Sequence, residues 1–127
     1  MQDKVTFEYA VIRVVPRVER EEFLNVGIIL FSKAKKYLEM KYHLPKEKLG
    51  ILCPDIDLEL LKSYLNAWER VCLGGRLGGP IGAFDTASRY RWLTATRSTI
   101  IQSSRTHPGL CEDPEKELEK LFALYVA

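Results

Sequence analysis

The first run of apolar residues alternates with a period of two, and this pattern predicts a β-strand over Val5 to Val15. The run is rich in β-branched and aromatic residues, and Pro16 ends it because proline cannot donate a ladder hydrogen bond. Both faces of the strand are largely apolar beyond Ala10. We therefore expect an interior strand of the sheet.

Two further strands are predicted after short connections. Phe23 to Phe31 contains an unbroken apolar run, and Gly27 inside it indicates a β-bulge or the close approach of another backbone. Tyr37 to His43 alternates well enough for a third strand. Because the connections are short, an antiparallel meander is the natural arrangement.

The middle of the chain carries the strongest helix pattern. Leu44 to Pro54 is irregular, and either Asp55 or Asp57 can then cap the start of a helix. A core-facing stripe follows at spacings of three and four residues, made of Leu58, Leu61, Leu65, Trp68 and Cys72. Gly74 and Gly75 end this helix.

The remaining sequence is less regular. Residues 74–82 hold five glycines and are expected to form a flexible loop, which favours a hinge or lid. A short helix near Asp85–Tyr90, a fourth strand over Ser98–Ser103 and a turn over Thr106–Cys111 follow. Asp113, followed by proline, caps a C-terminal amphipathic helix. The predicted fold class is α+β, with about four antiparallel strands against two main helices.

Composition supports one domain over residues 1–127, a length that can bury a core of its own. Three cysteines without a CxxC unit argue against a disulfide framework or structural zinc, so neither a metal nor another cofactor is expected. No apolar run approaches the roughly 20 residues that span a bilayer. We therefore expect a cytoplasmic protein with no membrane partner and an oligomeric state that the sequence leaves open.

Charge is distributed unevenly, although the formal net charge is only +2. Residues 76–107 contain five arginines, no lysine and a single acidic residue, Asp85. Within this segment Arg89, Arg91, Arg97 and Ser98 form a candidate anion site, because the guanidinium fork pairs with carboxylate or phosphate. The alternative is that these arginines border the sheet and pair with acidic residues of the fold.

A second candidate lies where a charged connection enters the second strand. Arg20, Glu22 and Asn25 stand there close to Gly27. They would line a ligand pocket at the end of the sheet, or they would form an ion pair and an asparagine-stabilised turn.

A third group, His107, Cys111, Glu112 and Asp113, contains a thiol and an imidazole close in sequence. A nucleophile–base pair is conceivable in such a group, but a loop histidine beside a half-buried cysteine is the more ordinary interpretation. The glycine-rich segment lacks the GK[ST] ending of a P-loop and follows a helix instead of a strand.

Taken together, these units resemble the bacterial family catalogued as domain of unknown function 3037 (DUF3037). The resemblance covers essentially the whole chain. It rests on four units: Arg20-x-Glu22-x-x-Asn25-x-Gly27, Arg89-x-Arg91-Trp92-Leu93, Arg97-Ser98, and Gly109-x-x-x-Asp113-Pro114. The family is named for lacking an established activity, and its members are often encoded beside a kinase-fold protein of the HipA type.

The resemblance and the residues together favour a small accessory or binding module with an arginine-lined, anion-recognising surface, in which Arg20, Arg89, Arg91 and Arg97 surround one polar pocket. Its partner would be a kinase-fold protein of the HipA type, a phosphate-bearing ligand or nucleic acid. We expect a binding protein more than an enzyme. One alternative is a small hydrolase or phosphodiester-cleaving enzyme that uses Glu22 or Glu112. Another is a nucleic-acid-binding protein, which steep salt dependence would reveal.

Overall fold

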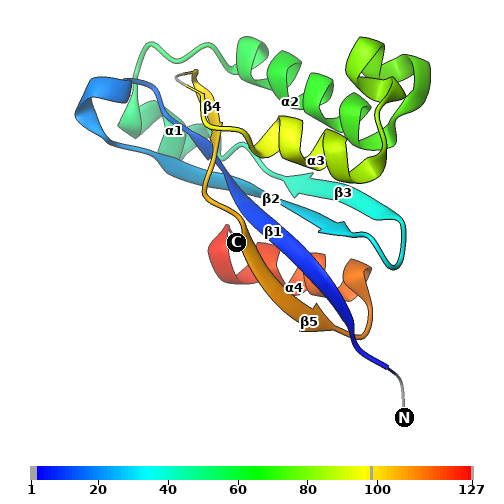
Figure 1. The fold of residues 1–127 in the computed structure, drawn as a ribbon. Coiled ribbons are helices and arrows are strands. Elements are labelled where there is room, and N and C mark those ends of the chain that lie inside the picture. Colours follow the sequence, from blue (N-terminus) through cyan, green and yellow to red (C-terminus); the bar gives the residue numbers. More distant parts are fainter. Residues whose placement is uncertain (1–2, 98, 127) are drawn as a thin grey trace.

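The computed structural model describes residues 3–97 and 99–126, which form an α+β fold around one open antiparallel sheet (Figure 1). This confirms the predicted fold class. The strands of the described residues are β1 (Val5–Val14), β2 (Leu24–Ser32), β3 (Tyr37–Tyr42), β4 (Ile101–Ser103) and β5 (His107–Cys111). Their order is β3-β2-β1-β4, and β5 also pairs with β1.

Strand β1 lies in the interior of this sheet, as predicted. On one side it pairs with β2 along most of its length. On the other side, β5 pairs with Val5–Tyr9 and β4 pairs with Ile12–Val14, so two short strands share one edge. Both long edges of β1 therefore have partners. Its two faces are apolar because each of them packs into a buried core.

Helices cover both faces of the sheet. They are α1 (Lys46–Leu52), α2 (Leu58–Leu73), α3 (Thr86–Thr94) and α4 (Pro114–Tyr125), with 3₁₀ turns η1 (Val18–Arg20) and η2 (Gly75–Ala83). In Figure 1, α2 and α3 lie on one side of the sheet and α4 lies on the other. The side chains of Asp57 and Asp113 accept hydrogen bonds from the first turns of α2 and α4, so both predicted starts are confirmed.

The two faces of the sheet enclose separate cores. The larger one lies under α2 and α3 and includes Ile12, Ile29, Leu61, Leu65 and Tyr90, all fully buried. The smaller one lies under α4 and includes Phe7, Val11, Ile28, Leu30, Leu118 and Leu121. Successive residues of β1 and β2 alternate between the two cores, as the period of two requires.

The bulge and the close approach expected at Gly27 are both present. The pairing of β1 with β2 shifts register where Ile12 faces Gly27 and Arg13 faces Asn25. A Cβ atom on Gly27 would lie 2.7 Å from the carbonyl oxygen of Lys41 in β3. The bulge lies at the end of the sheet from which the β1–β2 connection leaves.

Two segments differ from the sequence-based expectation. Leu44 to Pro54, predicted as irregular, contains α1, which buries only Leu49 and starts without a side-chain cap. Thr106 to Cys111, predicted as a turn, contains β5. Pro108 and Gly109 are typical of turns, but here Gly109 leaves room for the ring of Phe7 on the neighbouring strand.

The arginine-rich half also has different boundaries. The glycine-rich segment is not an open loop: it folds into the 3₁₀ turns of η2, interrupted where Gly79 has φ 64°. The helix predicted near Asp85–Tyr90 continues to Thr94 as α3. The predicted strand over 98–103 is shortened to β4, and Ser98 lies outside the described residues.

Candidate functional site

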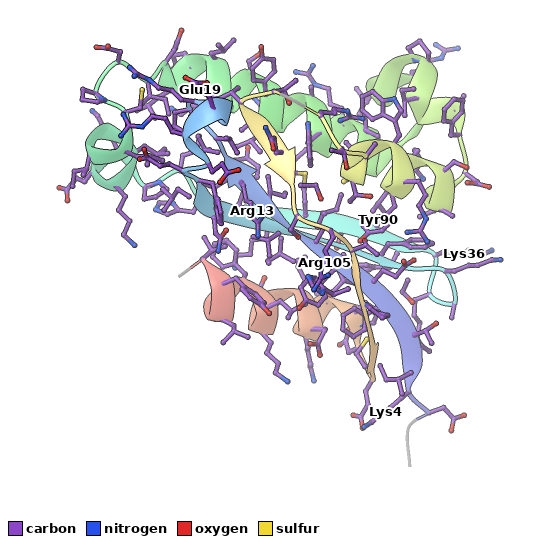
Figure 2. All side chains as sticks on the ribbon, turned by 60° about the vertical axis from the view of Figure 1, so that its left-hand side comes forward. Lys4, Arg13, Glu19, Lys36, Tyr90 and Arg105 are labelled. Atoms are coloured by element: carbon purple, nitrogen blue, oxygen red, sulfur yellow. The ribbon has the colours of Figure 1, made fainter. Side chains whose placement is uncertain are left out.

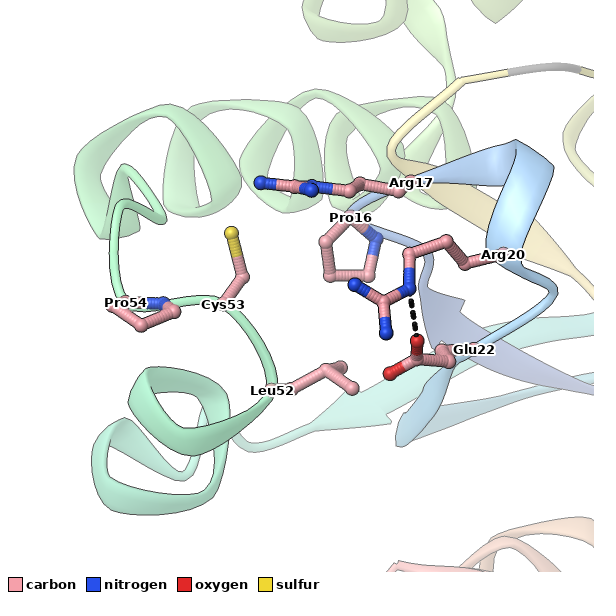
Figure 3. Close-up of a pocket in the computed structure, with 7 residues that line it drawn as sticks. All are labelled: Pro16, Arg17, Arg20, Glu22, Leu52, Cys53 and Pro54. Carbon is pink, nitrogen blue, oxygen red and sulfur yellow. Dashed lines mark ion pairs between the residues drawn. The ribbon is translucent and has the colours of Figure 1, made fainter.

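A cavity lies between the β1–β2 connection and the end of α1 (Figure 3). Its volume is about 110 Å³, several times the roughly 15 Å³ that admits one water molecule. Its lining residues are Pro16, Arg17, Arg20, Glu22, Leu52, Cys53 and Pro54. We call this cavity the Arg17–Arg20 pocket.

Local backbone geometry builds the first wall of the pocket. Pro16 ends β1, and the N–H of Arg20 donates to the carbonyl of Arg17 at 3.1 Å to close the turn η1. Glu21 has φ 56°, in the left-handed region, and this reverses the chain towards β2. Glu22 thereby faces Arg20, whose Nε lies 2.6 Å from its Oε1.

The opposite wall comes from the end of α1. Leu52 is the last residue of that helix, and Cys53 and Pro54 follow it into the connection to α2. Figure 3 shows the Arg17 side chain reaching across the cavity towards the Cys53 side. The carbonyl end of α1, which carries partial negative charge, thus lies on the same cavity as the two arginines.

The two arginines differ in whether a carboxylate of the protein already pairs with them. Arg20 is paired with Glu22, and the two side chains are 60% and 43% exposed. Arg17 is exposed and forms no ion pair within the residues that the structure describes. The pocket therefore holds two guanidinium groups and one carboxylate, an excess of one positive charge.

Arg89 does not reach this pocket, because the protein backbone occupies its guanidinium group. Its Nη1 donates to the carbonyls of Val71 at 2.8 Å and Cys72 at 2.7 Å. Its Nε donates to the carbonyl of Phe84 at 3.1 Å. A Cβ atom on Gly74 would lie 2.9 Å from this guanidinium. Arg89 thus satisfies the carbonyl end of α2 and joins it to the start of α3.

Arg91 forms a two-pronged ion pair with Glu8 of β1. Its Nη1 and Nη2 lie 2.9 and 2.7 Å from Oε1 and Oε2 of the carboxylate. The hydrogen bond to Glu8 raises the pKa of Arg91 above its ordinary value. Glu8 is six residues before Val14, so this pair lies about 20 Å along β1 from the strand end beside the pocket.

Arg97 and Asn25 have other partners again. The Arg97 guanidinium lies 4.2 Å from the centre of the Trp92 ring and donates to the Trp92 carbonyl, and burial lowers its pKa. Asn25 Nδ2 donates to the carbonyl of Tyr125 at 3.4 Å, while its buried Oδ1 has no partner among the described residues. Asn25 lines a separate cavity that also contains Phe23.

Of the site residues predicted from sequence, the structure brings together Arg20 and Glu22. Arg89, Arg91, Arg97 and Asn25 lie elsewhere with partners of their own, and Ser98 is outside the described residues. Sequence reasoning missed Arg17 and Cys53. Arg17 stands just after Pro16 in the same charged connection, and that position was its only signal.

One comparison with known proteins identifies the family. Residues 9–126 match the model of the family described as "Protein of unknown function (DUF3037)". The chain belongs to this family. The matched range contains every unit on which the resemblance rested. No curated protein and no solved structure matches the chain.

In this DUF3037 protein, structural contacts involve most of the third candidate group, which consists of His107, Cys111, Glu112 and Asp113. The Cys111 thiol is buried, and burial raises its pKa, which disfavours the thiolate a nucleophile needs. The His107 ring lies 5.2 Å from that of Tyr9, and Asp113 caps α4.

Over residues 3–97 and 99–126 there is neither a cluster of three metal-ligating side chains nor a helix long and apolar enough to span a bilayer.

Proposed function

We propose that this DUF3037 protein is a binding module that holds an anionic group of a protein partner in the Arg17–Arg20 pocket. The observation that carries the proposal is Arg17. It is an exposed arginine with no carboxylate partner among the described residues, and it borders a cavity that Arg20 also lines. Its fork can accept a carboxylate or a phosphate without breaking a contact of the fold.

The shape of the pocket supports binding by preorganised groups. Pro16 and Pro54 restrict the backbone on both walls, and the ion pair with Glu22 fixes the direction of Arg20. A ligand oxygen in the pocket could pair with Arg17 and would compete with Glu22 for Arg20. Because both arginines are exposed, binding should weaken as salt rises.

The resemblance to the family suggests the partner. A kinase-fold protein of the HipA type is the most concrete candidate, and it would present a carboxylate or a phosphorylated side chain to the pocket. The pocket has a volume of about 110 Å³, which one carboxylate or phosphate group can occupy beside the two arginines, so we take the recognised part to be a single anionic group.

A hydrolase receives less support from this geometry. Acid–base or metal chemistry by two carboxylates would require both of them beside the arginines. Glu22 is already paired with Arg20, and Glu112 lines a different cavity together with Asp113 and Glu115. The binding proposal needs no second carboxylate.

The test is co-purification with a kinase-fold protein of the HipA type, of the kind often encoded beside members of this family. We expect a complex with the natural protein, and its loss when Arg17→Glu reverses the charge at the pocket. Arg105→Glu is the matched control, because Arg105 is exposed and Figure 2 shows it far from Glu19 in the η1 turn. A complex that survives Arg17→Glu as well as it survives Arg105→Glu would refute the proposal. Recovery of nucleic acid in place of the protein would favour the nucleic-acid reading.

A further inference from the structure

Strand β3 forms an edge of the sheet that the described residues leave open. It pairs with β2 along all six of its residues, and the strand order places it at the end of the sheet. The opposite edge is short and divided between β4 and β5, and it contains Pro108, features that discourage further pairing. An unprotected edge of six residues is a template for another strand.

The pairing of β3 with β2 determines which backbone groups of β3 point towards the open edge. The N–H of His43, just beyond β3, donates to the carbonyl of Val26 at 2.8 Å. Backbone groups alternate along a strand, so the odd-numbered residues of β3 face β2. The N–H and C=O groups of Leu38, Met40 and Tyr42 therefore point away from the sheet at its open edge.

The side chains along this edge carry a self-complementary pattern. Glu39 and Lys41 flank Met40 with opposite charges and lie on the α4 face of the sheet. In an antiparallel pair centred on Met40, each Glu39 stands directly opposite Lys41 of the second copy. The centre falls on a hydrogen-bonded pair, so Glu39 and Lys41 occupy the non-hydrogen-bonded positions, where opposing side chains lie closest.

From this geometry we infer that two copies of the chain associate through β3, with Met40 on the twofold axis. Leu38 of each copy pairs with Tyr42 of the other, and the two sheets become one continuous sheet. The partner at this edge is a second copy because the charges along β3 complement themselves in an antiparallel pair: Glu39 of each copy faces Lys41 of the other. Lys41 is held over the Phe122 ring, 4.8 Å from its centre, and contacts Glu119, which keeps it on the face where Glu39 would meet it.

Sedimentation velocity on the purified full chain at tens of micromolar tests this inference. We expect a species of about twice the 14.6 kDa chain mass. Glu39→Lys and Lys41→Glu each place like charges opposite one another, so each should weaken self-association by about tenfold or more. Thermal melting of each variant checks that it remains folded.

Mixing the two variants gives the decisive result. A chain with Glu39→Lys and a chain with Lys41→Glu are complementary at both charge pairs, so an equimolar mixture should restore the association that each change alone weakens. Hydrogen exchange at the amides of Leu38, Met40 and Tyr42 should slow as protein concentration rises.

Three outcomes would overturn the inference. They are a natural chain that stays monomeric, a dimer that ignores both single charge changes, and folded variants that do not associate when mixed. None of them bears on the Arg17–Arg20 pocket, because Arg17 and Arg20 lie outside β3. The dimer would also be refuted if the kinase-fold partner bound β3 of a chain that is itself monomeric.

Discussion

Arginines in this chain are distinguished by what already occupies their guanidinium groups. Arg89 is bound to carbonyl oxygens at the end of α2, and Arg91 is bound to both oxygens of Glu8. Arg17 borders a cavity and has no ion-pair partner in the described part of the chain. The same residue type therefore serves as a helix terminator, a cross-link and a candidate contact.

Replacing Arg89 by Met should lower the free energy of unfolding by about 3 kcal/mol, because carbonyls of Val71 and Cys72 would lose a charged donor. Arg91→Met is the matched control. Its ion pair is 56% exposed on the arginine side, so we expect a loss below about 1 kcal/mol. Urea unfolding of the two variants measures both values. Equal losses would show that Arg89 does not anchor the end of α2.

At the scale of the elements, local chemistry in the sequence predicts the starts of helices well. Asp57 and Asp113 cap α2 and α4 because the capping carboxylate bonds to amides within three residues of it. Strand β5 escaped prediction because its support is the distant strand β1, and Pro108-Gly109 is locally typical of a turn. Helix α1 escaped because it buries one residue and lacks a side-chain cap.

The candidate site likewise has one part that local sequence predicts and another part that depends on tertiary packing. Arg20 and Glu22 were identifiable because a turn brings together residues that are close in sequence. Arg17 and Cys53 line the same pocket because of the tertiary placement of α1, which no local pattern encodes. The arginines at 89, 91 and 97 looked alike in sequence, and their separate partners are set by packing.

Two glycines give a matched test of the element contacts. Gly27→Ala should destabilise the protein by about 1–3 kcal/mol, because the new Cβ would meet the Lys41 carbonyl at 2.7 Å. Gly50→Ala should stabilise it by about 0.5–1 kcal/mol, because Gly50 lies in α1 and a Cβ there meets nothing within 4 Å. Thermal unfolding of both variants provides the comparison. A neutral Gly27→Ala would contradict the close approach of β3 to β2.

At the scale of the whole molecule, buried tyrosine phenols make the stability of the fold depend on pH in the alkaline range. Burial is the main cause that raises the pKa of Tyr9, Tyr42 and Tyr90 from 10.0 to about 12. Above pH 10 the unfolded chain loses these protons before the folded chain does, so stability falls between about pH 10 and pH 12 and is unaffected below that range. Urea unfolding at successive pH values measures this slope, which Tyr90→Phe should make shallower. Constant stability up to pH 11.5 would contradict the burial of these phenols.

The measurement that tests the pocket most directly is a titration with inorganic phosphate at constant ionic strength, followed by ¹H–¹⁵N NMR of the full chain. Phosphate is a small anion that the cavity of about 110 Å³ can admit. We expect saturable shifts at the Nε–H signals of Arg17 and Arg20 and at the Cys53 amide, and we expect Arg17→Ser to abolish them. Shifts confined to Arg91 or Arg97, or no saturable shift at the pocket, would contradict it.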